Sequence, residues 1–336
     1  MILSPSNISY FFTDVQVRFW NAYGAAPTWM SRIATEIPSS TEQNGYGWLG
    51  MMEKLRAWKG TRTVHTPAPS TYFVENKPFE LTYGIDEFRL KDDTYGIYYP
   101  LVANMGLQAR KWPDYQLRDL ICNVSTSEWW YSATSVGPQL SLDGVAHWSG
   151  SHLIDPNDSG KGTYVNDYST GTSSHGVTCG GVLTPNAYAT VWTDMMARVS
   201  ENSESLGLVG DLLMVPGQLD LTAKTILHAQ FFAPQTATGL IGTGTNVGAM
   251  ANVLVGSSDL LTNNDLNGAS AVAWYLLCTS KPIKPFIWQL REAPDFVIRN
   301  VPSDPVVFDT HTYLYGTKAR GAPGWSLPFL SSRSGV

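Results

Sequence analysis

Residues 40–83 constrain the fold more than any other part of the chain, because their pattern suits a structure that cannot be stable alone. Four glycines separate aromatic residues in the first half of this segment, around a short helical pattern at residues 51–58. In the second half, apolar and polar residues alternate, as in Phe79-Glu80-Leu81-Thr82-Tyr83, and this pattern favours a β-strand. A long two-stranded hairpin has too few internal contacts for independent stability. We therefore expect an extended arm that lies on a neighbouring molecule.

Two long helices are predicted, one before the arm and one after it. The first covers residues 4–24, with Ser6 or Asn7 as its N-cap, and the second covers residues 97–122, with Pro100 in its first turn. Both segments have an apolar stripe at helical spacing. The stripe residues are Phe11, Val15, Phe19 and Tyr23 in the first helix and Val102, Met105, Ala109 and Trp112 in the second.

The rest of the chain indicates loops followed by a mixed block of helices and strands. Residues 125–183 are rich in Ser, Thr and Gly and favour loops with short strands. Thr184 and Pro185 suit a cap and a first helical residue, which predicts a helix to about residue 200, and a further helix is expected at residues 219–230. Residues 233–250 and 256–270 are expected to be loops of small polar residues. Strands are expected at residues 212–215, 251–255, 271–278, 286–290, 296–299, 306–308 and 313–319.

The composition favours a protein that meets other chains over a large surface. The chain is 43% hydrophobic and 15% charged, and it contains 12 Trp, 16 Tyr and 12 Phe. Aromatic side chains concentrate at packed interfaces, although a large all-β enzyme or a carbohydrate binder can have the same composition. The formal net charge of −6 argues against a dedicated nucleic-acid binder but is compatible with a container for nucleic acid.

The cysteines and the first residues indicate a protein made without export. Cys122, Cys179 and Cys278 are sparse and suit a reducing cytoplasm, where we expect all three to be small buried hydrophobes. No signal-peptide pattern is present, and no apolar run reaches the roughly 18 residues of a membrane span, so we expect no membrane contact. Because the first predicted helix begins only a few residues after Met1, we also expect no large N-terminal scaffolding domain within the chain.

Catalytic signatures with a mechanism are missing, so we predict that the protein is not an enzyme and has no catalytic, cofactor or metal site. Neither a nucleophile elbow nor a His-Glu-x-x-His zinc motif occurs, and the glycines at 242–248 have the wrong spacing for a dinucleotide site. His147 and His152, near Asp143 and Asp155, could form a metal or acid–base site, but a hydrogen-bonded polar loop is favoured. Glu128, beside two tryptophans, is a weak indication of a sugar cleft.

Three groups of motifs are the most specific features of the sequence. The first is Tyr46-Gly47-Trp48-Leu49-Gly50 with the run at residues 55–62; the second is Asn76-Lys77-Pro78-Phe79-Glu80 with the runs at 84–85, 92–98 and 105–106; the third is the run at 281–289 with those at 313–316 and 319–321. In their order and spacing they resemble the major head subunit T family of Mu-like transposable phages, over about residues 1–124 and 205–336. The middle departs from that family, because Asp143-Gly144 is followed by Val145-Ala146-His147-Trp148.

The resemblance implies an α+β fold, the tailed-phage major capsid fold of the Hong Kong type. It divides the chain into an N-terminal arm and helix at residues 1–45, an extended β-hairpin loop at 46–85, a peripheral domain with a long spine helix at 86–183 and an axial domain at 184–284. The C-terminal strands at 285–336 are expected to return to the peripheral domain.

The same resemblance implies a major capsid protein that assembles into hexamers and pentamers of an icosahedral head around double-stranded DNA, without sequence-specific contact. It implies a separate scaffolding protein and a portal protein at one vertex as further partners, and it leaves a decoration protein open. The expected location is the virion, after assembly in the cytoplasm of the host bacterium. The alternatives are an encapsulin-like nanocompartment shell and, less favoured, a glycosidase or carbohydrate binder.

The extended loop supplies the candidate contact residues. We expect its apolar side chains to be buried on a neighbouring subunit, because apolar burial contributes about 25 cal/mol per Å² before the costs of association. These residues are Tyr46, Trp48, Leu49, Leu55 and Trp58.

Overall fold

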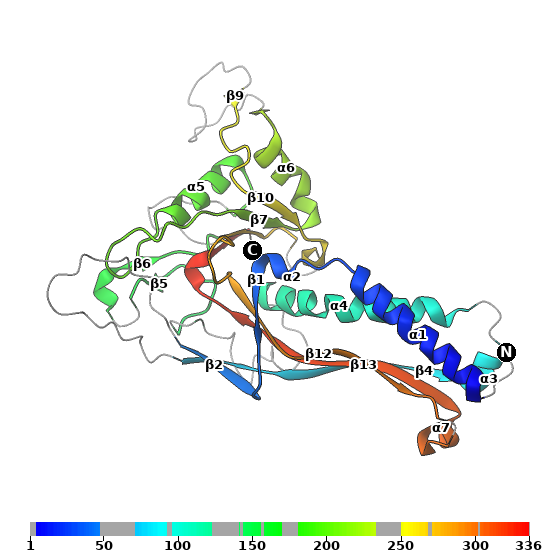
Figure 1. Cartoon of the computed structure of the whole chain (residues 1–336). Helices are drawn as coiled ribbons and strands as arrows, with labels where there is room; N and C mark the ends of the chain where they lie inside the picture. Colours follow the sequence, from blue (N-terminus) through cyan, green and yellow to red (C-terminus); the bar gives the residue numbers. More distant parts are fainter. Residues whose placement is uncertain are drawn as a thin grey trace.

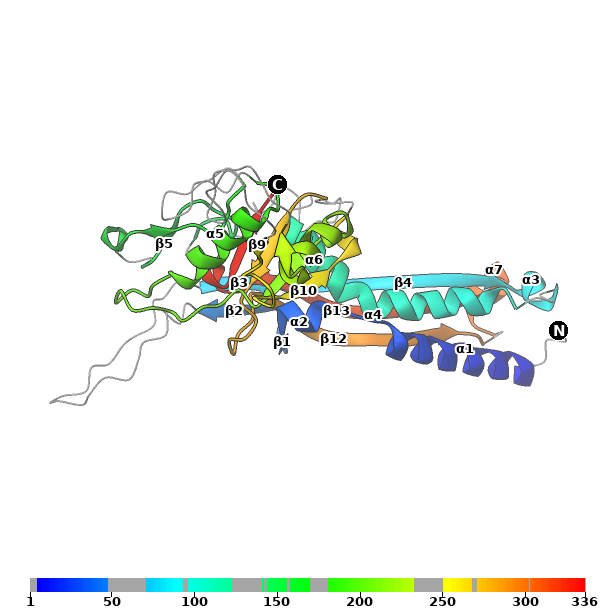
Figure 2. The same ribbon diagram turned by 90° about the horizontal axis from the view of Figure 1, so that it is seen from above.

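The computed structural model describes residues 5–47, 71–92, 96–122, 141, 144–155, 158–169, 181–232, 250–267, 271–301 and 303–335. These residues form two four-stranded sheets and two long helices, with shorter elements around them (Figure 1). One part of the molecule is long and narrow and the other is broad, as Figure 2 shows.

The long sheet has the strand order β1-β12-β13-β4. Its strands are β1 (Ala34–Pro38), β12 (Phe286–Arg299), β13 (Thr312–Trp325) and β4 (Lys77–Asp86), and only the β1–β12 pair is parallel. The two strands predicted at residues 286–290 and 296–299 are one strand with shifts in register between Leu290 and Asp295. Pro294 lies in this stretch, and because proline cannot donate to the ladder it is tolerated at such an irregularity.

Both predicted long helices are present, as α1 (Pro5–Ala25) and α4 (Tyr98–Cys122), and they pack on each other and on the long sheet. The two helices approach closely at Gly106, where a Cβ would lie 2.4 Å from the Phe19 carbonyl oxygen. The predicted stripes are buried, except that Tyr23 is half-buried. The N-cap prediction was wrong, because α1 begins at Pro5 and places Ser6 and Asn7 inside its first turn.

The second sheet has the order β10-β7-β11-β14, and its two central strands are buried on both faces. Its strands are β7 (Leu212–Val215), β10 (Asp259–Thr262), β11 (Trp274–Leu277) and β14 (Ser331–Ser334). Leu213 and Val215 face a core shared with α5 (Pro185–Met196) and α6 (Asp220–His228). Leu212 and Met214 face a core shared with Trp288 and the end of α4, which joins the two sheets.

Helix α5 begins as predicted. The Thr184 hydroxyl accepts a hydrogen bond from the Ala187 N–H at 3.1 Å, and Pro185 is the first helical residue. The remaining short elements are the helices α2 (Met30–Ile33), α3 (Glu87–Asp92) and α7 (Pro305–Thr310) and the strand pairs β2 (Gln43–Gly47) with β3 (Thr71–Glu75), β5 (His152–Leu153) with β6 (Thr163–Tyr164), and β8 (Phe231–Phe232) with β9 (Met250–Ala251).

Three local predictions were wrong. Residues 252–255 form turns and not a strand, because the Asn252 side chain accepts the Leu254 N–H and donates to the Ile226 carbonyl. Residues 306–308 belong to helix α7, where Pro305 sets the first helical dihedral angle and overrides the strand propensity of valine. The expected loop at residues 256–270 contains strand β10, which pairs with β7.

The C-terminal strands do not all return to the long sheet. Strands β12 and β13 lie in it, but β14 pairs with β11 in the second sheet. The buried Arg198 side chain holds this end of the chain, because it donates to the Phe329 carbonyl at 2.6 Å and to the Ser332 hydroxyl at 2.7 Å.

Candidate assembly surfaces

The hairpin of β2 and β3 is the described part of the segment that is expected to form the extended arm. The two strands, both labelled in Figure 2, are antiparallel. Their register runs from Gln43 opposite Glu75 to Gly47 opposite Thr71. This pairing agrees with the hairpin expected there. Trp48, Leu49, Leu55 and Trp58, and the short helix expected at 51–58, lie outside the described residues, so their burial on a neighbour stays a prediction.

A buried polar cluster, here called the arm root, fixes this hairpin to the long sheet. Its centre is Gln289 of β12, which is fully buried. The Tyr46 hydroxyl donates to Gln289 Oε1 at 2.8 Å. Gln289 Nε2 donates to Asn76 Oδ1 at 2.7 Å and to the Val74 carbonyl at 3.1 Å. One side chain of the sheet therefore binds both strands of the hairpin and the residue that follows it.

Asn76 extends the arm root to the other side of the hairpin. Its Nδ2 donates to the Ser39 hydroxyl at 2.7 Å and to the Thr41 carbonyl at 2.8 Å, and its backbone N–H donates to the Glu42 carbonyl at 2.8 Å. Both termini of the hairpin are thus held at one point. Because buried polar groups with satisfied partners specify a unique arrangement, the arm root fixes the hairpin of β2 and β3 relative to β12.

Tyr46 is the one predicted contact residue among the described residues, and its phenol is half-buried against its own chain. Burial raises the pKa of Tyr46, which keeps the hydroxyl protonated as the donor to Gln289. Sequence reasoning missed Gln289 and Asn76. A polar glutamine inside the apolar run at residues 286–290 was the signal that could have found them.

A second polar cluster joins the two sheets near the end of α1. Asp114 of α4 is fully buried and accepts hydrogen bonds from the Thr28 hydroxyl at 2.7 Å and the Met30 N–H at 2.9 Å. The Trp29 indole donates to Asp265, beside the second sheet, at 3.1 Å. Burial raises the pKa of Asp114, and the negative charge of Asp265 adds to this effect.

The histidine loop is a hydrogen-bonded structure in its described part. The fully buried His147 ring stacks on Trp325 with centroids 4.0 Å apart, and its Nε2 lies 2.9 Å from the Ser331 hydroxyl. His152 Nε2 lies 2.9 Å from the His147 carbonyl, and Asp155 pairs with Lys161 at 3.0 Å. Burial lowers the pKa of His147 well below its ordinary value.

The remaining candidates from the sequence are Asp143, Glu128 and the three cysteines. Asp143 and Glu128 lie outside the described residues, as does Cys179. Cys278 is buried as expected, whereas Cys122 is only half-buried; burial raises the pKa of the Cys122 thiol to about 11. Across the described residues, no group of three or more His, Cys, Asp or Glu side chains is placed to hold a metal ion.

None of the helices in the described ranges combines the length and apolar character needed to cross a bilayer.

The sequence matches one family model in two blocks. The model of the Mu-like prophage major head subunit gpT matches residues 8–131 and 249–335. The unmatched middle includes the region around residue 147, where the family pattern is broken.

Two curated relatives are likewise described as a major capsid protein or a major head subunit. The major capsid protein of Escherichia phage Mu is 33% identical over 166 residues, which cover 49% of this chain and 50% of that protein. The Mu-like prophage FluMu major head subunit of Haemophilus influenzae is 31% identical over 107 residues, which cover 32% of this chain and 35% of that protein. The matches thus span about half, or less, of the length of these relatives.

Solved structures show the same fold. The chain is similar to one in the procapsid of bacteriophage JBD30, with a TM-score of 0.53 and 26% identity over 99% of this chain and 76% of that one. A chain of the capsid of Cyanophage P-SCSP1u has a TM-score of 0.51 and 9% identity over 92% of this chain and 88% of that one.

The α+β fold is therefore the tailed-phage major capsid fold of the Hong Kong type, as the sequence motifs led us to expect. The chain belongs to the Mu-like prophage major head subunit gpT family.

Proposed function

We propose that this chain is the major capsid protein of a tailed double-stranded DNA phage, and that its copies assemble into the hexamers and pentamers of an icosahedral head. The observation that carries the proposal is the similarity to a procapsid subunit over 99% of the chain, together with the family match at both ends. The protein acts by geometry and not by catalysis.

The proposed mechanism uses one rigid body and one projecting arm. Helix α4 and the long sheet form the rigid body, because they pack on each other through two apolar clusters, one toward each end of the helix. The arm root holds the hairpin in a fixed direction, so the arm can lie over the next subunit, where Trp48, Leu49, Leu55 and Trp58 become buried. Such head-to-tail contacts close into rings when the rotation between subunits allows it.

The proposed division of the chain into domains follows the two sheets. The extended loop expected at residues 46–85 ends at residue 76 in this proposal, because β4 pairs with β13 in the long sheet. Residues 86–183 with the long sheet form the peripheral domain, and residues 184–284 form the axial domain. Strand β14 belongs with the axial domain in this proposal, because it pairs with β11.

The proposed partners are a separate scaffolding protein during assembly, a portal protein at one vertex and a decoration protein on the finished head. Packaged DNA touches the inner surface without sequence-specific contact, which agrees with a net charge of −6. The assembled protein is a component of the virion, and assembly takes place in the cytoplasm of the host.

Negative-stain microscopy of the purified protein tests this proposal. Closed shells or rings of five and six subunits are the expected result, and a protein that stays monomeric at all concentrations contradicts it. Nuclease-protected DNA in particles from a lysate separates a phage head from a nanocompartment, which would hold protein and no protected genome.

A further inference from the structure

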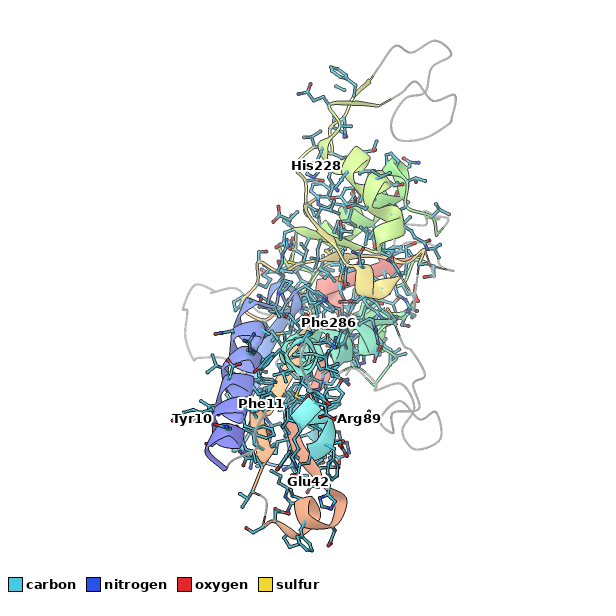
Figure 3. All side chains as sticks on the ribbon, turned by 90° about the vertical axis from the view of Figure 1, so that its right-hand side faces the viewer. Tyr10, Phe11, Glu42, Arg89, His228 and Phe286 are labelled. Carbon is cyan, nitrogen blue, oxygen red and sulfur yellow. The ribbon has the colours of Figure 1, made fainter. Side chains whose placement is uncertain are left out.

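Helix α1 is apolar on two opposite faces, and the described residues of a single subunit cover only one of them. The inner face packs on α4 and the long sheet through Phe12, Val15 and Phe19. Tyr10 and Val17 on the opposite face are 75% and 52% exposed, and Trp20 is 39% exposed. In Figure 3, Tyr10 points away from the body of the molecule while Phe11 points toward it.

The three exposed apolar residues lie with two further exposed residues on one stripe with heptad spacing, here called the outer stripe: Tyr10, Thr13, Val17, Trp20 and Gly24. Intervals of three and four residues over four helical turns are typical of a helix that packs against another helix. The Thr13 hydroxyl donates to the Ser9 carbonyl at 2.9 Å, so its polar group is already paired within α1.

The outer stripe carries no net charge. The 21 residues of α1 contain two charged side chains, Asp14 and Arg18, and these pair with each other at 2.9 Å. Arg18 also lies over the Tyr99 ring at 4.1 Å, so its charge is directed toward α4. A surface helix normally has a polar outer face, and a helix that is apolar all round is normally buried. A second copy of α1 can therefore approach without repulsion between like charges.

We propose that the outer stripe is a twofold contact, in which α1 packs antiparallel on α1 of a second copy of this chain. The inference rests on the proposed function, since it places the contact between subunits of one shell. With Val17 at the twofold axis, Tyr10 of one copy lies over Gly24 of the other, and Trp20 lies in the space between Thr13 and Val17 of the other.

Gly24 supports this register. A Cβ built at Gly24 has no atom within 4 Å, so this position offers open space on the stripe. Tyr10, the most exposed residue of the stripe, is the side chain that fills it in the antiparallel pair. The antiparallel direction also sets opposite ends of the two helix dipoles together, which is favourable.

The small apolar area of the outer stripe explains why this contact should form only within a shell. The exposed parts of Tyr10, Val17 and Trp20 amount to on the order of 300 Å² per copy. A stable isolated interface needs about 800 Å² per partner. Free subunits should therefore not pair through α1, whereas neighbouring subunits already held in a shell should do so.

Disulfide trapping of Val17→Cys in assembled particles tests the inference. Mild oxidation should convert most of the protein to a covalent dimer of doubled subunit mass, with no larger ladder, because a twofold contact joins copies only in pairs. The matched control is Gln16→Cys, which is exposed on the flank of the same helix and should give little dimer. The unmodified chain, with its three native cysteines, gives the background.

Gly24→Leu in the Val17→Cys background provides the second measurement. Leucine has free space within its own subunit, so the protein should fold, but the side chain occupies the site of Tyr10 and should lower the dimer yield about tenfold. Well-formed shells without a Val17→Cys dimer would overturn the twofold contact and leave the proposed function intact. A cross-link to a different protein would also overturn it, whereas absence of shells from the unmodified chain would contradict the proposed function itself.

Discussion

Replacement of Gln289 by methionine removes the centre of the arm root at nearly constant volume. Three hydrogen bonds disappear: one from the Tyr46 hydroxyl, one to Asn76 Oδ1 and one to the Val74 carbonyl. The methionine side chain can fill the space but can replace none of these partners.

The expected loss in the free energy of unfolding depends on which of the former partners can form a hydrogen bond with water instead. The Asn76 side chain is buried and its Oδ1 loses the donor that it accepts from, which costs about 1–3 kcal/mol. The Val74 carbonyl loses one bond, at about 0.5–1.5 kcal/mol, and the half-buried Tyr46 hydroxyl can turn to solvent at little cost. We therefore expect Gln289→Met to lower the free energy of unfolding by about 2–4 kcal/mol.

Urea unfolding of the unassembled subunit measures this loss as a change in midpoint at constant slope. Tyr46→Phe is the matched control, because it removes a single bond of the cluster and should cost about 1 kcal/mol. A Gln289→Met variant within 0.5 kcal/mol of the unmodified chain would refute the view that the arm root is a satisfied buried cluster. So would a Tyr46→Phe variant as unstable as Gln289→Met.

Three further predictions follow from the same structure. Trp48→Ala combined with Trp58→Ala should leave a folded subunit that assembles poorly, and normal heads from this double variant in the microscope would exclude the proposed role of the arm. Within one asymmetric unit, residues 46–83 and the N-terminal arm should differ most between pentamer and hexamer subunits; if they superpose as well as α4 does, curvature comes from rigid hinging. His147 is buried with a lowered pKa, so the unfolded chain binds its proton more readily and stability should fall by about 1.4 kcal/mol per pH unit below pH 6.5. His147→Gln should flatten that slope in urea titrations from pH 7 to pH 5, and an unchanged slope would assign the acid sensitivity to other groups.

Local residue patterns in the sequence were sufficient to predict the long helices and several strands. The apolar stripes of α1 and α4 and the four apolar residues of β7 appear where the pattern placed them. The Thr184 cap is also recognisable from the chain alone. Where local preferences competed, prediction failed: the valines at 253 and 255 favour a strand, but the Asn252 side chain stabilises turns.

The arm root could not be predicted, because it joins residues that are far apart in the chain. Gln289 and Asn76 are separated by 213 positions and meet only because β12 passes beneath the hairpin. A single sequence marks such residues as polar groups in apolar surroundings, but it does not tell which partner each will have. The same reason explains β14, whose pairing with β11 depends on the whole second sheet.

A reconstruction of particles formed by this chain tests the central claim most directly. The account predicts a closed shell in which copies of this one chain occupy both five-subunit and six-subunit rings, with α4 and strands β12 and β13 superposing in every copy. A particle whose shell is made of another protein, with this chain at a single vertex or absent, would contradict it.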